Sequence, residues 1–285
     1  MIPALPVRLR SRLVLLLASV AGLAVFVWPL LISPGAAVAG QSADAPLVFL
    51  FTLPVLVLIV LTELGSGGID AKALALLGVL SAINAALRPL GAGTAGIETV
   101  FFLLVLAGRV FGPGFGFVLG ATSMFASALL TAGVGPWLPF QMLAASWVGL
   151  GAGLLPRGVR GKREIALLAG YGVLAAYAYG LLLNMSYWPY ATGSGTDLSY
   201  VAGAPVLENL QRFLVFTVVT STVGWDTGRA LTNLVAIVLL GPAVLVALRR
   251  AARRAAFDAP VTFAPGPATS VAGRPASAPD ASVGS

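Results

Sequence analysis

Residues 140–183 read FQMLAASWVGLGAGLLPRGVRGKREIALLAGYGVLAAYAYGLLL, and this stretch contains two apolar runs on either side of a short basic loop. The runs cover Phe140 to Leu155 and Ile165 to Leu183. The loop between them carries Arg157, Arg160, Lys162 and Arg163. Apolar runs of this length suit a hydrocarbon core about 30 Å thick, and short basic loops stay on the cytoplasmic side. The stretch therefore predicts two membrane helices joined in the cytoplasm.

The composition of the whole chain agrees with a membrane protein. Hydrophobic residues make up 58% of it and charged residues only 9%, whereas about a quarter of the residues in a soluble domain are charged. The net charge of +7 gathers beside the apolar runs, where it orients helices and meets anionic lipid. We therefore expect an all-α integral membrane protein in contact with the lipid bilayer, and no nucleic-acid partner.

Further apolar runs extend the same threading in both directions. They are Leu13 to Ile32, Leu47 to Thr62, Ala73 to Leu87, Thr99 to Phe111, Phe115 to Ala132 and Ala230 to Leu248. Several are shorter than the usual span of about 20 residues, so their flanks must extend them or the bilayer must thin. The prediction is a six-helix core preceded by two extra transmembrane helices.

One apolar run does not fit a crossing. Leu210 to Val223 is too short for a full span and is interrupted by polar side chains, which is typical of an interfacial or re-entrant segment. It is predicted to be a non-spanning amphipathic helix at the outer surface. The residues before it, Met185 to Pro205, are predicted to face outward.

The first run allows two interpretations. Arg8, Arg10 and Arg12 precede it and the small residues Ala37 to Ala39 follow it, as in a secretory signal peptide. Its apolar run is longer than the signal-peptide core of about 7 to 15 residues, which favours a retained anchor. The predicted organisation is a pair of transmembrane helices in residues 1–64, a membrane core in 71–256 and a disordered cytoplasmic tail in 257–285, where Ala, Pro, Ser and Gly show no periodicity.

The basic residues divide unequally between the two sides of this threading. Fourteen of the seventeen fall on one side, which the positive-inside rule makes cytoplasmic together with both termini. Arg88, Arg212 and Arg229 remain on the other side. Orientation does not explain these three residues.

Polar and aromatic residues lie at the same outer ends of the spans as these arginines. Because such groups are costly at membrane depth, they tend to face the interior or a watery cavity. The candidate substrate-binding residues are Asn84, Arg88, Glu98, Trp137, Gln141, Trp225, Asp226, Arg229 and Asn233. Taken singly, the tryptophans also suit an interfacial aromatic belt, and Asp226 with Arg229 suits a helix-start carboxylate in a local ion pair.

Small residues recur at every fourth position of the run that starts at Ala73. Gly78, Ala82 and Ala86 share one stripe, where small side chains let another helix approach closely. The stripe is predicted either to pack within the bundle or to form an interface with a separate membrane partner.

The chain lacks the residues of common catalytic sites. It has no Cys and no His, which excludes disulfides, Cys or His metal sites and an imidazole base. It has no P-loop motif, and Gly112 to Gly116 is interpreted as a tight turn with close helix packing. We expect no enzyme activity, no cofactor and no metal, but a protein that binds a ligand.

Several segments resemble the substrate-binding S component of energy-coupling factor (ECF) vitamin transporters. They are residues 98–104, 108–117, 120–121, 124–127, 135–142 and, in the C-terminal part, 220–222, 225–230 and Asn233. Within that family, these segments are similar to the cobalamin-type members. The resemblance covers about residues 71–250, and the first two spans and the tail lie outside it.

The resemblance implies a protein of the bacterial cytoplasmic membrane that binds a vitamin at its outer face, here cobalamin or a related corrinoid. It also implies a membrane coupling subunit and two ABC ATPase subunits as partners, with Gly78, Ala82 and Ala86 contacting the coupling subunit. Two alternatives remain open. One is an S component for another micronutrient, and the other is a membrane structural or assembly protein without a transport role.

Overall fold

The computed structural model of the chain describes residues 9–31, 55, 71–91, 96–191, 196–201 and 203–255. The second predicted span, residues 47–62, lies outside the described residues except for residue 55, and so does the predicted tail. The statements below concern the described residues.

Every regular element in these ranges is helical. The elements are α1 (Leu9–Phe26), α2 (Trp28–Leu31), α4 (Ala71–Leu87), the 3-10 helix η2 (Arg88–Leu90), α5 (Val100–Phe111), α6 (Pro113–Leu130), α7 (Leu138–Leu154), α8 (Lys162–Ala191), α9 (Val206–Thr217), the π-helix η3 (Val218–Asp226) and α10 (Thr227–Ala255). The six predicted core spans correspond to α4, α5, α6, α7, α8 and α10. The all-α membrane fold is thereby confirmed.

Helix length and composition agree with a multi-pass membrane protein. Within the described ranges, three helical stretches are long and apolar enough to cross a membrane, namely Pro113–Leu130, Lys162–Pro189 and Val206–Arg254. The shorter apolar helices include α5, whose 12 residues span about 18 Å. Every residue of α5 is buried, so this short helix is enclosed by the bundle.

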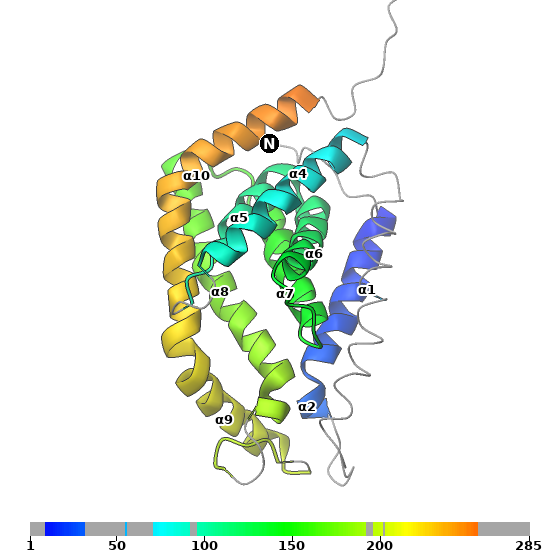
Figure 1. The fold of residues 1–285 in the computed structure, drawn as a ribbon, viewed down its shortest axis with the longest axis vertical. Coiled ribbons are helices and arrows are strands. Elements are labelled where there is room, and N and C mark those ends of the chain that lie inside the picture. The colour runs from blue at the N-terminus through cyan, green and yellow to red at the C-terminus, as the bar shows by residue number, and fades with distance from the viewer. Residues whose placement is uncertain are drawn as a thin grey trace, which may run out of the picture.

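The six core helices alternate in direction and define two ends of the bundle (Figure 1). At the basic end, α8 begins at Lys162 and α10 finishes beside Arg253 and Arg254. At the mouth end, α4 and α6 finish, and α5, α7 and α10 begin. The α8 helix and α9 extend further in the direction of the mouth end, at the bottom of Figure 1.

Glycines bring the central helices into close contact. A Cβ atom added to Gly149 of α7 would collide with the backbone of Gly116 of α6, and one added to Gly120 would collide with the backbone of Ala145. The turn before α6 uses Gly112 at φ 109°, followed by Pro113 in the first helical turn, where proline suits the fixed φ of a helix start. The predicted tight turn and close packing of residues 112–116 are thus present.

The N-terminal helix α1 packs against α7, antiparallel to it. Trp147 donates a hydrogen bond from Nε1 to Ser19 Oγ at 2.9 Å. Phe26 is fully buried, with its ring 5.2 Å from that of Phe140. Leu30 of α2 packs against the aromatic cluster around Trp188. These contacts make α1 and α2 a packed part of the bundle.

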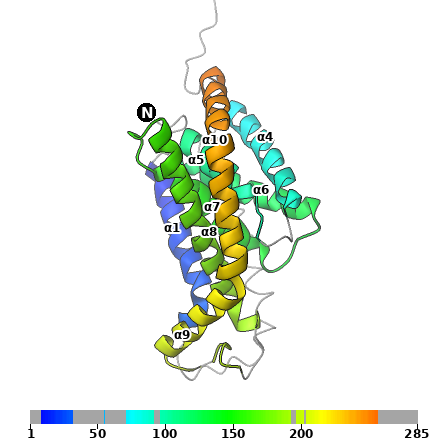
Figure 2. The same cartoon turned by 90° about the vertical axis from the view of Figure 1, so that its left-hand side faces the viewer.

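The predicted amphipathic segment differs from its expected form. Instead of a separate helix, α9 continues through the π-helix η3 into α10, so helical structure runs from Val206 to Ala255. A run of about 50 residues exceeds the membrane thickness by far, and α9 lies at the mouth end of the molecule while α10 packs beside α8 (Figures 1 and 2). Pro242 inside α10 accounts for the bend in its C-terminal part.

Candidate functional site

A buried ion-pair network joins two distant segments at the mouth end. Arg229 of α10 donates from Nε to Glu98, which precedes α5, and from Nη1 to Asp226 Oδ1 at 2.8 Å. Asp226 also accepts a hydrogen bond from Ser221 Oγ at 3.0 Å. Asp226 is only 1% exposed and Arg229 only 7%. Charges buried to this degree in a membrane helix pair with one another and mark functional sites by default.

Aromatic rings frame the guanidinium of this network. The Cζ atom of Arg229 lies 5.0 Å from the ring centroid of Tyr179 and 5.7 Å from that of Phe101. Both distances are within the range of a cation–π interaction. The two rings are themselves in edge contact, with centroids 4.7 Å apart. The guanidinium is therefore fixed by carboxylates and by aromatic faces.

Two close backbone approaches fix the position of the network. A Cβ atom at Gly180 of α8 would collide with the carboxylate of Asp226, so glycine is needed there for α8 to pass. Gly96 adopts φ 76° and lies against the backbone of Trp225, which ties the segment before α5 to the π-helix. π-Helical turns are rare and are frequent at functional sites, and here Asp226 is the last residue of one.

A second polar group extends from α4 to its neighbours. Arg88 donates from Nη2 to Gln141 Oε1 of α7 at 3.1 Å. One turn earlier, the buried Asn84 donates to Ser123 Oγ of α6 at 3.0 Å. These two hydrogen bonds join α4 to α7 and to α6.

Asn233 is placed differently from the other candidate residues. It is 0% exposed, and neither Oδ1 nor Nδ2 has a hydrogen-bond partner in the described part of the chain. It lies one helical turn beyond Arg229 on α10, facing Gly172 of α8. A buried polar group without a partner costs about 1 to 3 kcal/mol, so this amide needs a separate explanation.

The two candidate tryptophans lie at the surface. Trp137 is 51% exposed and its Nε1 donates to the carbonyl of Gly133 at 3.2 Å, so its ring folds over its own turn. Trp225 is 45% exposed. The structure thus joins Glu98, Asp226 and Arg229 in one ion-pair network. Arg88 bonds to Gln141, and Asn84 bonds separately to Ser123. Neither tryptophan is enclosed with them.

The small-residue stripe of α4 faces away from the bundle. Gly78, Ala82 and Ala86 are all exposed, and a Cβ atom added to Gly78 would meet no atom within 4 Å. The buried face of the same helix carries Leu77, Leu80, Ser81 and Asn84. This placement favours an interface with a partner over packing within the chain.

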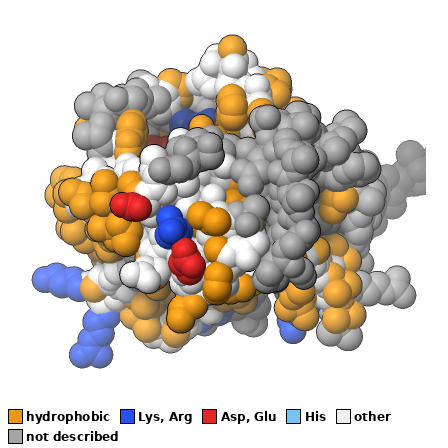
Figure 3. Space-filling view, turned by 90° about the horizontal axis from the view of Figure 1, so that it is seen from below, with side chains coloured by type: hydrophobic (Ala, Val, Ile, Leu, Met, Phe, Trp, Pro, Cys, Tyr) orange, Lys and Arg blue, Asp and Glu red, His pale blue; other side chains and the backbone are white. Residues whose placement is uncertain are grey.

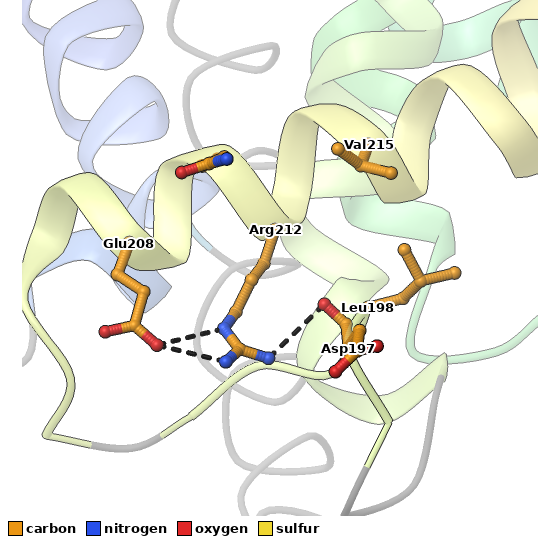
Figure 4. Close-up of a pocket in the computed structure, with 6 residues that line it drawn as sticks. Asp197, Leu198, Glu208, Arg212 and Val215 are labelled. Atoms are coloured by element: carbon orange, nitrogen blue, oxygen red, sulfur yellow. Dashed lines mark hydrogen bonds and ion pairs between the residues drawn. The ribbon is translucent and has the colours of Figure 1, made fainter.

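The third arginine of the mouth end, Arg212, lies beside a separate hollow of about 300 Å³ at α9 (Figure 4). It donates to Glu208 at 3.0 Å and to the carbonyl of Asp197 at 3.3 Å. In the view of the mouth end, basic and acidic side chains adjoin one another on a surface that is otherwise largely apolar or neutral where it is described (Figure 3). Since the Glu208 pair is exposed, it contributes little to stability.

A buried charge cluster at the basic end was missed by the sequence interpretation. Glu164 of α8 binds Arg109 of α5 at 2.8 Å and Arg249 of α10 at 2.7 Å. Arg109 also donates to the carbonyls of Leu155, Pro156 and Val159. The sequence predicts only an orienting role for these arginines, because nothing in it pairs residues so far apart.

The same cluster influences the basic loop. Burial lowers the pKa of Arg157, and the nearby charge of Arg109 lowers it further. Because arginine titrates far above neutral pH, Arg157 still carries its charge there. The cluster thus joins α5, α8 and α10 and lies beside the positively charged loop.

Comparison with known families identifies the chain. The family model for the ECF transporter substrate-specific component matches residues 72–252, which is more than half of the sequence. The chain belongs to this family. No curated protein and no solved structure matches it. Substrate-specific components bind the transported substrate and are not enzymes, so the expectation of a binding protein is confirmed.

The family assignment also indicates where the protein works and with which subunits. An ECF transporter component works in the membrane with coupling and ATPase subunits. The family match favours transport over the alternative of a membrane assembly protein.

Proposed function

We propose that this protein captures a vitamin at the outer face of the bacterial cytoplasmic membrane for an ECF-type ABC importer. The observation that carries the proposal is the buried group of Glu98, Asp226 and Arg229 framed by Tyr179 and Phe101. A purely structural membrane bundle gains little from burying three charges, since a well-packed apolar substitute is often as stable.

The basic end faces the cytoplasm in this proposal, and the mouth end faces outward. The loop with Arg157 and Arg160 and the end of α10 with Arg253 and Arg254 lie together at one end, as the positive-inside rule requires of cytoplasmic segments. Both termini are then cytoplasmic. Substrate enters between the segment before α5, the turn at Trp137 and the π-helix.

Cobalamin or a related corrinoid is the proposed substrate. Its peripheral amides and phosphate suit the side chains of Arg88, Asn84, Gln141 and Asn233, and the exposed rings of Trp137 and Trp225 suit its broad apolar ring. Another micronutrient with amide or acidic groups would use the same residues, and it is the second candidate.

We also propose partner subunits, which bind away from the mouth-end residues. The exposed stripe of Gly78, Ala82 and Ala86 would contact the membrane coupling subunit, because small residues allow close helix approach. Two ABC ATPase subunits would complete the complex.

Thermal unfolding of the purified protein in detergent tests the substrate assignment. Cyanocobalamin is expected to raise the unfolding temperature, and titration calorimetry should give a saturable isotherm. A panel of other vitamins provides the control. Stabilisation by a different vitamin alone would replace cobalamin as substrate, whereas stabilisation by none would overturn vitamin binding.

A further inference from the structure

Asn233 stands apart from the other buried asparagines. Asn209, 4% exposed, accepts from the amide of Val201 and donates to its carbonyl. Asn84 uses its Nδ2 on Ser123. Asn233 uses neither side-chain atom within the described ranges, although it is 0% exposed. Among the described residues, its amide is fully enclosed and unpaired.

The position of this amide relates it to the mouth-end network. Residues four apart on a helix lie on the same face, so Asn233 is one turn from Arg229 and nearer the basic end. Across from it, a Cβ atom at Gly172 would lie 3.5 Å from the Cβ of Asn233 and 2.9 Å from Cδ1 of Ile237. The side chain is therefore held between α10 and a closely approaching α8. A ligand that enters from the mouth meets Arg229 first and Asn233 last.

The chemistry of the unpaired group restricts what it can recognise. A side-chain amide offers an acceptor oxygen and an NH₂ donor side by side. A carboxylate would satisfy only Nδ2 and would face Oδ1 with a negative charge, and an ammonium would satisfy only Oδ1. A group that presents C=O and N–H together satisfies both atoms.

We propose that Asn233 is the innermost substrate-recognition residue and that it pairs edge to edge with an amide-type group of the substrate. Carboxamides, lactams and ureido groups have this edge. The inference rests on the proposed function. It adds the chemical class of the substrate group that binds deepest in the bundle. Because Asn233 is 0% exposed, binding involves displacement of the side chains that enclose it.

Substitution of Asn233 separates recognition from a structural role. In the full-length chain in detergent, Asn233→Ala is expected to weaken binding of the stabilising vitamin by about tenfold or more, as for a site left with an unmatched hydrogen-bonding partner. Asn233→Leu should also bind weakly. Without ligand it should unfold at the same temperature as wild type or higher, because it removes an unpaired buried amide.

Asn209→Leu is the matched control. It breaks two observed hydrogen bonds, so it should lower the unfolding temperature and leave affinity unchanged. Unchanged affinity in Asn233→Ala would overturn the inference, whatever the stability of the variants.

The choice of probes keeps this inference distinct from the proposed function. Cyanocobalamin, biotin, riboflavin and nicotinamide carry an amide-type edge, whereas pyridoxine does not. Stabilisation of wild type by one of the first four, with loss of affinity in Asn233→Ala, supports the inference. Stabilisation by pyridoxine alone would overturn the inference and leave vitamin binding intact. Stabilisation by none of the five would overturn both.

Discussion

Glu98 and Arg229 lie 131 positions apart in the chain and form an ion pair at the mouth of the bundle. Arg229 also binds Asp226, three residues before it. One guanidinium therefore joins the segment that leads into α5 to the last residue of the π-helix. Its charge is already matched within the protein, unlike that of Arg88, whose described hydrogen-bond partner is the neutral side chain of Gln141.

Replacement of Arg229, a residue of the proposed substrate site, should also lower stability. Arg229→Ala leaves Glu98 and the almost fully buried Asp226 without their partner, and loss of one member of a buried ion pair costs about 3 to 5 kcal/mol. Chemical unfolding in detergent would measure the change. Arg212→Ala is the control, because its pair with Glu208 is exposed and should contribute less than about 1 kcal/mol. Equal stability of the two variants would contradict a structural role for the network.

Replacement of Arg88 is the cleaner test of ligand binding. Arg88 is half-buried and its described side-chain contact is the hydrogen bond to Gln141, so Arg88→Ala should fold normally. It is expected to weaken vitamin binding by about 1.5 to 3 kcal/mol, the range for a hydrogen bond to a charged group. Titration calorimetry with cyanocobalamin or the vitamin that stabilises wild type would show this. Arg212→Ala, at the hollow beside α9, should retain wild-type affinity.

The sequence was sufficient for the helices and insufficient for the contacts between them. The spans were predictable because apolar runs, basic loops and glycine turns are local features, and Phe140 to Leu155 corresponds closely to α7. The α8 helix includes Ile165 to Leu183 but continues to Ala191, into the segment predicted to follow the span. The joining of α9 to α10 was not predictable. A π-helix leaves no periodicity that distinguishes residues 218–226 from an interfacial segment.

The residues of the candidate site were likewise predictable from the sequence, whereas their contacts were not. Charged residues at the mouth end were identified because they are rare in apolar runs. Their pairing depends on which helices meet, so the bond of Glu98 to Arg229 and the contact of Arg229 with Tyr179 could not be read from spacing. The cluster of Arg109, Glu164 and Arg249 was missed for the same reason.

The basic-end cluster should be important for stability rather than binding. Glu164→Gln removes the one carboxylate shared by Arg109 and Arg249, leaving two cations beside each other. We expect a loss of about 3 to 5 kcal/mol, as for a broken buried ion pair, with ligand affinity retained in folded protein. Thermal unfolding and titration at the same detergent concentration would separate the effects. An unfolding temperature equal to that of wild type would show that the arginines find other partners.

The orientation of the bundle can be tested without background labelling, because the chain contains no cysteine. Arg160→Cys lies in the exposed basic loop and should react with a membrane-impermeant maleimide only after the cells are opened. Val201→Cys, exposed at the mouth end, should react in intact cells. The opposite pattern would place the mouth in the cytoplasm and remove the proposed route of substrate entry.

The exposed stripe of α4 gives a test of coupling that is independent of the ligand. Ala82→Leu adds bulk where nothing in the described bundle covers the helix, so the isolated protein should fold and bind its vitamin as wild type does. Close helix approach depends on small residues, so the variant should fail to copurify with a coupling subunit and should lose uptake. Ala166→Leu, an exposed alanine of α8, is the matched control and should retain both. Loss of vitamin binding in Ala82→Leu would instead show that the stripe supports the fold of the chain itself.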